Sequence, residues 1–243
     1  MSSQPFPSLA SVGLDGLLVR FADHLSEPAN RAALAFRAAL ERANIPQIEE
    51  TSTSLVSTYV RFDPLHLPLE RLEAQIKALL AGQDWYAAEL PSGRRLIEIP
   101  TVYGTDLAPQ LAEAARLAGM SEAEAITSLS SARTRVTTIG FAPGQPYLGT
   151  LPEPWDIPRQ TGLTPKVPVG ALVVAIRQFV LFSVSTPTGW RHIGQTAAQL
   201  FQPDAAEPFL LRPGDEVVFP AVPRDAFEAL QADPMGGIRM RPL

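Results

Sequence analysis

The chain has 243 residues, of which 46% are hydrophobic and 19% are charged, and its formal net charge is −5. This length suits one large domain or two smaller ones, and the apolar content is sufficient for a buried core. The complete absence of cysteine excludes disulfides, thiolate metal sites and cysteine nucleophiles.

The residue pattern also bears on partners and location. No run of Lys or Arg forms a basic patch, so we expect no nucleic-acid partner. The longest apolar run, Val169 to Ile176, has only strand length, and the first residues lack the regions of a signal peptide. We therefore expect no membrane span and a cytoplasmic location. The 24 prolines lie mostly after residue 90, between short apolar runs, which is typical of a β-rich domain with rigid turns.

The first part of the chain alternates strand and helix patterns. Its helices are indicated by apolar residues at helical spacing and by prolines in the first turn. The expected elements are a strand at Gly16–Ala22, a helix beginning after Ser26, strands at Ile45–Glu50 and Ser54–Phe62, and a helix from Pro68 to Gly82. The order β-α-β-β-α predicts a small α+β domain over residues 1–88, ferredoxin-like in outline.

Residues 89–243 are predicted to form a second, mostly-β domain. A strand in RRLIEIPTVYG is followed by a helix from Pro109 to Ala118, and the pair Ser121 and Glu124 predicts a capping box for a short helix. Seven short runs then follow, punctuated by Gly and Pro: RVTTIGFA, VPVGALVVAI, FVLFSVS, WRHIGQT, AQLF, PFLL and DEVVF. They predict a sandwich or a barrel. The tail after Phe219 is weakly patterned, and we expect it to pack on the surface.

The loop GFAPGQPYLG, Gly140 to Gly149, is the first candidate for a functional segment. Its glycines allow close approach of a ligand or a left-handed backbone, and its prolines stiffen it. Phe141 and Tyr147 would form a pocket wall in the functional interpretation. In the structural interpretation they anchor a rigid crossing between two strands, and composition favours this second view.

Two further segments carry polar residues that could serve a ligand. In TPTGWRHIGQT the tryptophan, His192 and threonines suggest either a polar site or a hairpin with a buried Trp, with His192 solvated on the opposite face. In IPRQTGLTPKVPVG, Arg159 and Lys166 on a stiff loop would hold an anion, or would simply be solvated. LRPGDEVVF is interpreted as a turn entering a strand.

The usual catalytic signatures are missing from this sequence. It contains no GxSxG, HExxH, GxxxxGK[ST] or GxGxxG pattern. With three histidines and no cysteine, we expect no metal site. These residues therefore indicate a two-domain protein with a proline-rich β domain, and they do not identify a reaction.

Four motifs in order give this sequence a family resemblance. GFAPGQPYLGTLP resembles the GFxPGFxYLxGLP signature of the KipI and allophanate hydrolase subunit 1 family, which includes the B subunit of 5-oxoprolinase and part of the carboxyltransferase region of urea carboxylases. IPRQTGLTPKVPVGA resembles that family's PRR-x-x-PR-x-x-VPAGS stretch, Thr186–Thr196 its SPGGW-x-x-IGRT, and PFLLRPGDEVVF its ending. The resemblance covers residues from about 10 to 220.

The resemblance implies a fold and a function. The fold would be a small α+β domain followed by a cyclophilin-like β-barrel. The function would be that of a subunit of an ATP-dependent amidohydrolase of the 5-oxoprolinase or allophanate hydrolase type, acting on a small cyclic amide or urea derivative. A homologous second subunit, of the type of allophanate hydrolase subunit 2 or of the C subunit of 5-oxoprolinase, would be its partner, together with a third subunit. ATP would act at the level of that complex.

The site residues follow from the positions at which this chain keeps or loses the family pattern. Family arginines fall on Gln160, Thr164 and Gln195, and the second signature Phe falls on Gln145. The substrate-pocket candidates that the resemblance leaves are Pro143, Gly144, Tyr147, Arg159, Lys166, Gln178, Gly189, Trp190 and Thr196. Arg159 and Lys166 would neutralise anionic charge, and Gln178 and Thr196 would orient the substrate. No residue stands out as a general base.

The sequence is also compatible with a regulatory function. The family's namesake inhibits a sensor histidine kinase, and a chain that has lost cationic positions would suit a regulatory protein that kept the fold and lost catalysis. Peptidyl-prolyl isomerase activity rests on fold analogy alone and is given little weight.

Overall fold

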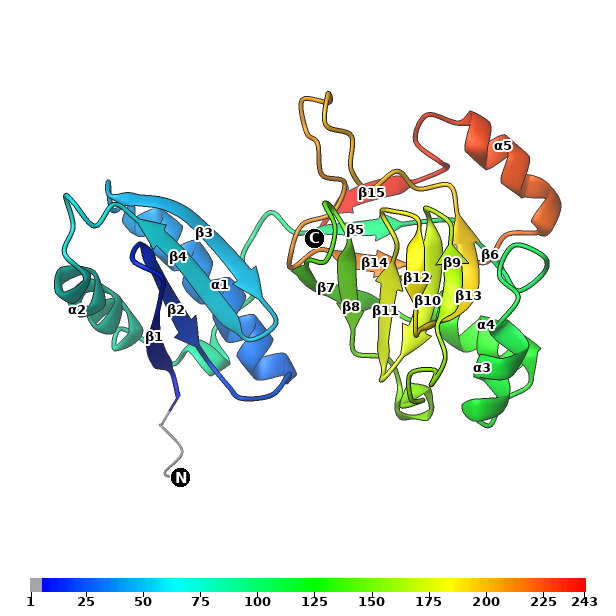
Figure 1. Cartoon of the computed structure of the whole chain (residues 1–243), viewed down its shortest axis with the longest axis horizontal. Helices are drawn as coiled ribbons and strands as arrows, with labels where there is room; N and C mark the ends of the chain where they lie inside the picture. The colour runs from blue at the N-terminus through cyan, green and yellow to red at the C-terminus, as the bar shows by residue number, and fades with distance from the viewer. Residues whose placement is uncertain (1–5) are drawn as a thin grey trace. The chain divides into compact units, whose positions relative to one another are not determined.

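The computed structural model describes residues 6–243, and the chain divides into two compact units, one ending at Ser92 and the other spanning Gly93–Leu243. The sequence predicts a boundary between residues 88 and 89, close to this division. The protein is mostly β, with antiparallel sheets and several helices (Figure 1). Residues 1–5, on which part of the signal-peptide expectation rests, lie outside the described residues. Over residues 6–243, no helix is both long and apolar enough to cross a membrane.

The first unit is a four-stranded antiparallel sheet with two helices. Its elements are β1 Ser8–Val12, β2 Gly16–Arg20, α1 Glu27–Ala43, β3 Ile48–Ser54, β4 Ser57–Phe62, α2 Leu69–Leu80 and a 3-10 turn at Trp85–Ala87. The strand order is β1-β2-β4-β3, so β4 lies between the two strands that α1 connects. The predicted helices and strands are present, but β3 begins three residues and ends four residues later than expected, β4 begins three residues later than expected, and β1 was not predicted.

Alternation along the strands explains how this unit builds its core. In β4, Thr58, Val60 and Phe62 are buried, while the residues between them are half-buried. Val60 and Phe62 join Leu17 from β2, Phe36 from α1 and residues of α2 in one apolar cluster. The helix α1 starts at the predicted N-cap, Ser26, with proline in its first turn, as the sequence indicated.

The second unit contains the remaining elements. These are β5 Arg95–Glu98, β6 Thr101–Tyr103, α3 Leu111–Leu117, α4 Glu122–Ser131, β7 Thr134–Ile139, β8 Pro146–Gly149, β9 Thr164–Val167, β10 Ala171–Ala175, β11 Gln178–Leu181, β12 Thr186–Thr188, β13 Arg191–Thr196, β14 Glu216–Val218, α5 Phe227–Ala232 and β15 Arg239–Pro242, with 3-10 turns at Glu153–Trp155 and Arg224–Ala226. The capping box of Ser121 and Glu124 is present at the start of α4.

The strand pairings of this unit form a closed ring. Antiparallel pairs run β7-β8-β11-β10-β13-β6. Strand β6 continues the segment that begins with β5, and β5 pairs in parallel with β14, which pairs back to β7. Strands β9 and β12 form a separate two-stranded sheet, and β15 adds to β5.

Strand β10 shows why the second unit is apolar on both sides of its sheet. Leu172 and Val174 point into the larger apolar cluster, which also receives residues of α3 and α4. Ala171, Val173 and Ala175 point to the other side and pack in a smaller cluster with Trp190. Burial on both faces explains the continuous apolar run that the sequence shows here.

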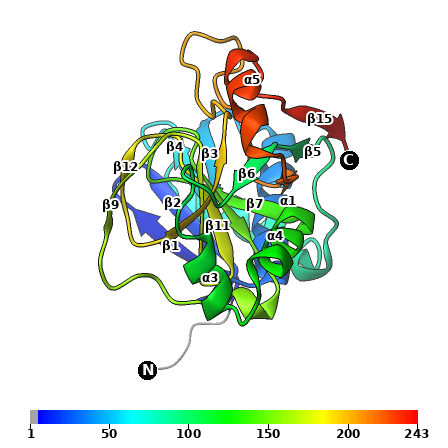
Figure 2. The ribbon, with the colours of Figure 1, turned by 90° about the vertical axis from the view of Figure 1, so that its right-hand side faces the viewer.

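Two expectations for this unit are wrong. The runs AQLF and PFLL are not strands, because they contribute only an isolated bridge between Phe201 and Phe209. His192 is buried, because every residue of β13 is buried and neither face of this strand is open to solvent. The tail after Phe219 lies at the surface, as expected, and it forms the mostly exposed elements α5 and β15, with α5 well apart from the α3–α4 pair (Figure 2).

Candidate functional site

Three of the residues predicted for the substrate pocket come together around Trp190. The ring of Tyr147 on β8 meets that of Trp190 edge to face, with centroids 6.3 Å apart. The guanidinium of Arg159 lies 5.1 Å above the Trp190 ring. Arg159 is exposed and has no ion-pair partner among residues 6–243, so its charge faces the solvent at this cluster.

The other predicted residues do not join them. Lys166 is exposed on β9 and lines a separate hollow, described below. Thr196 is buried in β13, where its hydroxyl donates to the Gly170 carbonyl at 3.1 Å and accepts from the Ala198 N–H at 3.2 Å. Gln178 is half-buried at the start of β11. The hydroxyl of Thr196 therefore stabilises the backbone of its own unit.

The loop from Gly140 to Gly149 is a tight turn entering β8. Gly144 has φ +72°, and a Cβ there would lie 2.7 Å from the Leu200 carbonyl oxygen, so this glycine permits a close backbone contact. Pro143 is exposed. Phe141 is 72% exposed with φ +73°, so the interpretation of this residue as a core anchor is wrong. The turn geometry, and not apolar burial, holds Phe141 in place.

A polar network that the sequence did not predict lies where α3, β9 and β13 meet. The Gln110 amide donates to Gln160 Oε1 at 2.8 Å, and the Gln160 amide donates to Thr164 Oγ1 at 3.1 Å. The Thr164 hydroxyl donates to Gln110 Oε1 at 3.3 Å, which also accepts the His192 N–H at 2.8 Å. This closed set of bonds fixes the loop before β9 to the strand β13.

Two hollows meet at this network and share Gln110 and Thr164. The first, which we name the amide hollow, has a volume of about 490 Å³ and is lined by Gln110, Glu113, Gln160, Thr161, Gly162, Leu163, Thr164, Pro165 and Arg191. The second, the histidine hollow, has a volume of about 440 Å³ and is lined by Asp106, Leu107, Pro109, Gln110, Thr164, Lys166, Pro168, Val169, His192, Gln195, Phe227 and Gln231. Both are of a size that suits a small molecule.

The charge in the amide hollow comes from an ion pair. The side chain of Arg191 is only 7% exposed, and its Nε donates to Glu113 Oε1 at 2.9 Å. Its Nη1 donates to the Pro158 carbonyl at 2.5 Å. The guanidinium therefore ties α3 and the loop after Pro158 to β13, and Glu113 balances its charge.

The histidine hollow has a neutral polar floor. Burial lowers the pKa of His192, although the backbone of Gly194 and the side chain of Gln195 oppose this effect. Nε2 of His192 and Oε1 of Gln195 are both buried, and neither has a hydrogen bond of normal geometry with any residue from 6 to 243. The Gln195 amide nitrogen donates to the Val169 carbonyl at 2.8 Å. At neutral pH this floor therefore carries no charge, and Lys166 supplies the cation at the rim.

One feature of the sequence does point to these hollows. Gln160, Thr164 and Gln195 are the three positions at which the family pattern has arginine, and all three line a hollow. The residues missed altogether are Gln110, Glu113 and Arg191. They lie on α3 and β13 or beside them, far apart in the sequence, and no local motif joins them.

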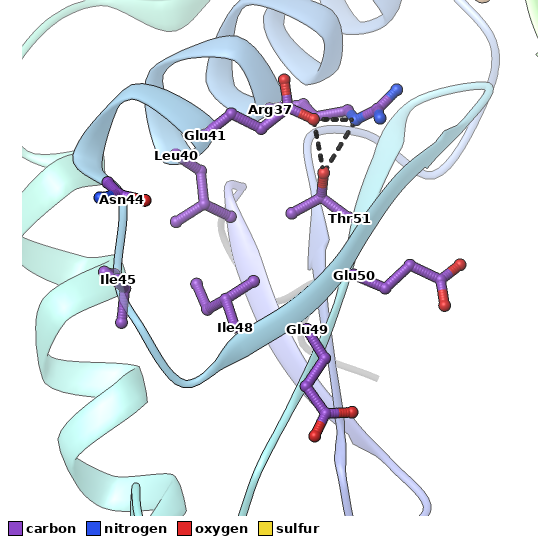
Figure 3. Close-up of a pocket in the computed structure, with 9 residues that line it drawn as sticks. All are labelled: Arg37, Leu40, Glu41, Asn44, Ile45, Ile48, Glu49, Glu50 and Thr51. Carbon is purple, nitrogen blue, oxygen red and sulfur yellow. Dashed lines mark hydrogen bonds and ion pairs between the residues drawn. The ribbon is translucent and has the colours of Figure 1, made fainter.

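A third hollow lies on the first unit and is less suited to binding (Figure 3). Its volume is about 340 Å³, and Leu40 and Ile48 point toward each other across it. Its cation, Arg37, is already bound by Glu41 at 3.0 Å and donates to Thr51 at 3.0 Å. We therefore take the two hollows of the second unit as the candidate site. Among residues 6–243, no cluster of His, Asp and Glu is arranged to hold a metal ion.

Comparison with known proteins identifies the family. The family model described as carboxyltransferase domain, subdomain C and D, matches residues 7–211. The B subunit of 5-oxoprolinase from Bacillus subtilis (strain 168) is 30% identical over 235 residues, which cover 93% of this chain and 97% of the relative. The subunit of the same name from Escherichia coli O157:H7 is 36% identical over 187 residues, covering 76% and 83%.

A solved structure agrees with this result. The crystal structure of TTHA0988 aligns with a TM-score of 0.72 at 31% identity, over 86% of this chain and 40% of that chain. This chain thus spans less than half of that protein. The chain belongs to the carboxyltransferase-domain family that contains the B subunit of 5-oxoprolinase, which confirms the resemblance seen in the sequence.

Proposed function

We propose that this chain is a subunit of an ATP-dependent amidohydrolase of the 5-oxoprolinase type, which acts with a homologous second subunit on a small cyclic amide. The observation that carries the proposal is the similarity to the B subunit of 5-oxoprolinase along almost the whole of both chains. The two hollows are consistent with it, because glutamine amides and a hydroxyl dominate their shared wall. These relatives favour the hydrolase subunit over the kinase inhibitor.

The fold layout belongs to the same proposal. We assign residues 1–88 to a ferredoxin-like domain and 89–243 to a cyclophilin-like barrel. The first assignment is supported by the position of β4 between the strands that α1 connects. The second is supported by the ring of pairings from β7 through β13 and back through β14.

The partner assignment is supported by the length of a relative. TTHA0988 has a chain of which this protein matches only 40%, so a longer polypeptide of the family carries additional parts. We propose that separate subunits supply the equivalent parts here, a homologous second subunit and a third one. We place the complex in the cytoplasm, where ATP is available.

ATP is assigned to the complex and not to the hollows of this chain. A triphosphate requires several cations or a row of backbone N–H groups. The hollows offer Lys166 and Arg191 as cations, and Glu113 already balances Arg191. The residues present do not fit a triphosphate, and they fit a small, weakly charged ligand better.

Among the predicted pocket residues, we assign ligand contacts to those with side chains that remain available. Lys166 at the histidine hollow would attract an anionic group, and so would Arg159 above Trp190, whose ring Tyr147 also contacts. Gln178 is half-buried and keeps its proposed role in orienting the substrate. The positions Pro143, Gly144 and Thr196 would support the site through the backbone.

The test is reconstitution of the complex. The tagged chain is expressed with candidate subunits, and glutamate formation from 5-oxoproline is measured with and without ATP and with each subunit omitted in turn. We expect stable copurification and activity that needs ATP and every subunit. A chain that purifies alone and leaves 5-oxoproline unchanged in all combinations would refute the proposal. Lys166→Gln, compared with Arg42→Gln on the first unit, should raise the KM selectively.

A further inference from the structure

The buried guanidinium of Arg191 has one nitrogen that the fold does not use. Nε is bound by Glu113 and Nη1 by the Pro158 carbonyl. Nη2 makes no hydrogen bond with any residue from 6 to 243, and it is not among the sealed polar atoms of that range. A purely structural arginine at this depth would be expected to engage all of its donors. One strong donor therefore remains available on a residue that lines the amide hollow.

The electrostatic setting of Arg191 decides what this donor prefers. Glu113 already neutralises the guanidinium, and the side chain of Glu113 is 41% exposed at the edge of the hollow. A ligand carboxylate placed on Nη2 would bring a second negative charge near Glu113 in a partly desolvated site. A neutral carbonyl oxygen accepts the same N–H without that repulsion.

The wall around Arg191 complements an amide. Gln160 Oε1 accepts one bond, from Gln110, and keeps a second lone pair for an N–H donor. Gln110 Nε2 donates one bond, to Gln160, and has a second N–H. The loop from Thr161 to Pro165 lines the hollow and carries an exposed leucine, Leu163, which offers an apolar surface for the ring of a small ligand.

We propose that the amide hollow binds the amide edge of a small lactam, with Arg191 Nη2 donating to the carbonyl oxygen and Gln160 Oε1 accepting the N–H. The inference rests on the proposed function, because it names the group that this subunit would recognise. It makes Arg191 a binding residue for the amide carbonyl and leaves the ligand carboxylate to the exposed cations.

The experiment is a double comparison of ligand and variant. Binding of 5-oxoproline, cyclopentanecarboxylate and 2-pyrrolidinone to the assembled complex, and to the chain if no complex forms, is measured by calorimetry or by competition. Cyclopentanecarboxylate keeps the ring and the carboxylate but lacks the amide, and 2-pyrrolidinone keeps the amide but lacks the carboxylate. The variants are Arg191→Gln, Arg191→Lys and, as the control, Arg159→Gln. Circular dichroism and thermal unfolding check that each variant is folded.

The expected result is a selective loss. Arg191→Gln should reduce the preference for 5-oxoproline over cyclopentanecarboxylate by about 10- to 100-fold, the range for a hydrogen bond from a charged donor. Arg191→Gln should have little effect on the ratio of the affinities for 5-oxoproline and 2-pyrrolidinone. Arg159→Gln should reduce this ratio. Arg191→Lys, which keeps a charged donor, should restore part of the amide preference.

Three outcomes would overturn the inference. They are equal weakening of all ligands by Arg191→Gln, loss of the carboxylate contribution in place of the amide contribution, and no binding of any ligand to the wild type. Turnover of 5-oxoproline with an unchanged ligand preference in Arg191→Gln would refute this inference and leave the proposed function standing. Amide binding that depends on Arg191, without any turnover, would support this inference and refute the proposed function.

Discussion

The clearest test of the structure is the substitution Gly144→Ala in the turn before β8. Gly144 has φ +72°, a conformation that costs a residue with a Cβ about 1–2 kcal/mol. The added Cβ would lie 2.7 Å from the Leu200 oxygen and 3.1 Å from its carbonyl carbon, and crowding of this kind costs about 1–3 kcal/mol. Reduced freedom of the unfolded chain returns about 0.4–1 kcal/mol. We expect a net loss of about 2–4 kcal/mol.

The measurement is thermal unfolding followed by tryptophan fluorescence and calorimetry. Two of the three tryptophans, Trp155 and Trp190, lie in the second unit, so fluorescence mainly reports on that unit. A loss of this size should lower its Tm by roughly 5 to 15 °C. Hydrogen exchange in the peptides that contain Gly144 and Leu200 should increase, because these two segments separate first.

The control lies in the same turn. Gly140 is not in the left-handed region, and a Cβ there would meet nothing within 4 Å. Gly140→Ala should therefore be neutral or stabilise the protein by up to about 1 kcal/mol. If Gly144→Ala melts within about 2 °C of wild type, or if both variants lose the same stability, the contact with Leu200 does not constrain this loop as the structure indicates.

Two further predictions concern buried charges. Asp215 is 3% exposed and accepts from the Arg95 side chain and backbone and from the Arg212 N–H, so Asp215→Asn should cost about 2–4 kcal/mol in urea unfolding. Glu207→Gln, at the exposed pair with Arg212, should cost less than about 1 kcal/mol, and equal losses would contradict this ranking. The pKa of His192 is lowered by burial, so the unfolded state binds more protons below about pH 6.5 and stability should decline as the pH falls below that value. His192→Gln should flatten this decline by up to about 1.4 kcal/mol per pH unit. An unchanged slope would show that His192 is not the group responsible.

The mutational predictions and the proposed binding site depend on different kinds of contact. Gly144 and Asp215 act through backbone and ion-pair contacts within the second unit, and their effects should appear in the isolated chain. The roles of Lys166 and Arg159 concern a ligand, and their effects should appear in ligand preference with little change in stability, whereas Arg191→Gln should change both, because it also breaks the buried pair with Glu113. The two sets of variants thus separate folding from recognition.

Local sequence determined several elements of this protein directly. The capping box of Ser121 and Glu124 begins α4, and the proline after Ser26 begins α1, because the groups that satisfy a helix end lie within three or four residues of it. The apolar run of β10 marks a strand buried on both faces. The order of four motifs was sufficient to identify the family, which the comparisons confirm.

Only the tertiary structure decided where the site lies. Arg191 and Glu113 meet because β13 pairs with β6 and α3 packs on β13, and a contact between segments so distant in sequence depends on strand register that no local pattern encodes. The same packing buries His192, for which alternation along the strand predicted exposure. The tail that looked unpatterned folds as α5 and β15 because an existing sheet edge and the histidine hollow are there to receive it. Local hydrogen bonding and periodicity act over a few residues, whereas a binding site collects side chains from elements that meet only after the whole unit has folded.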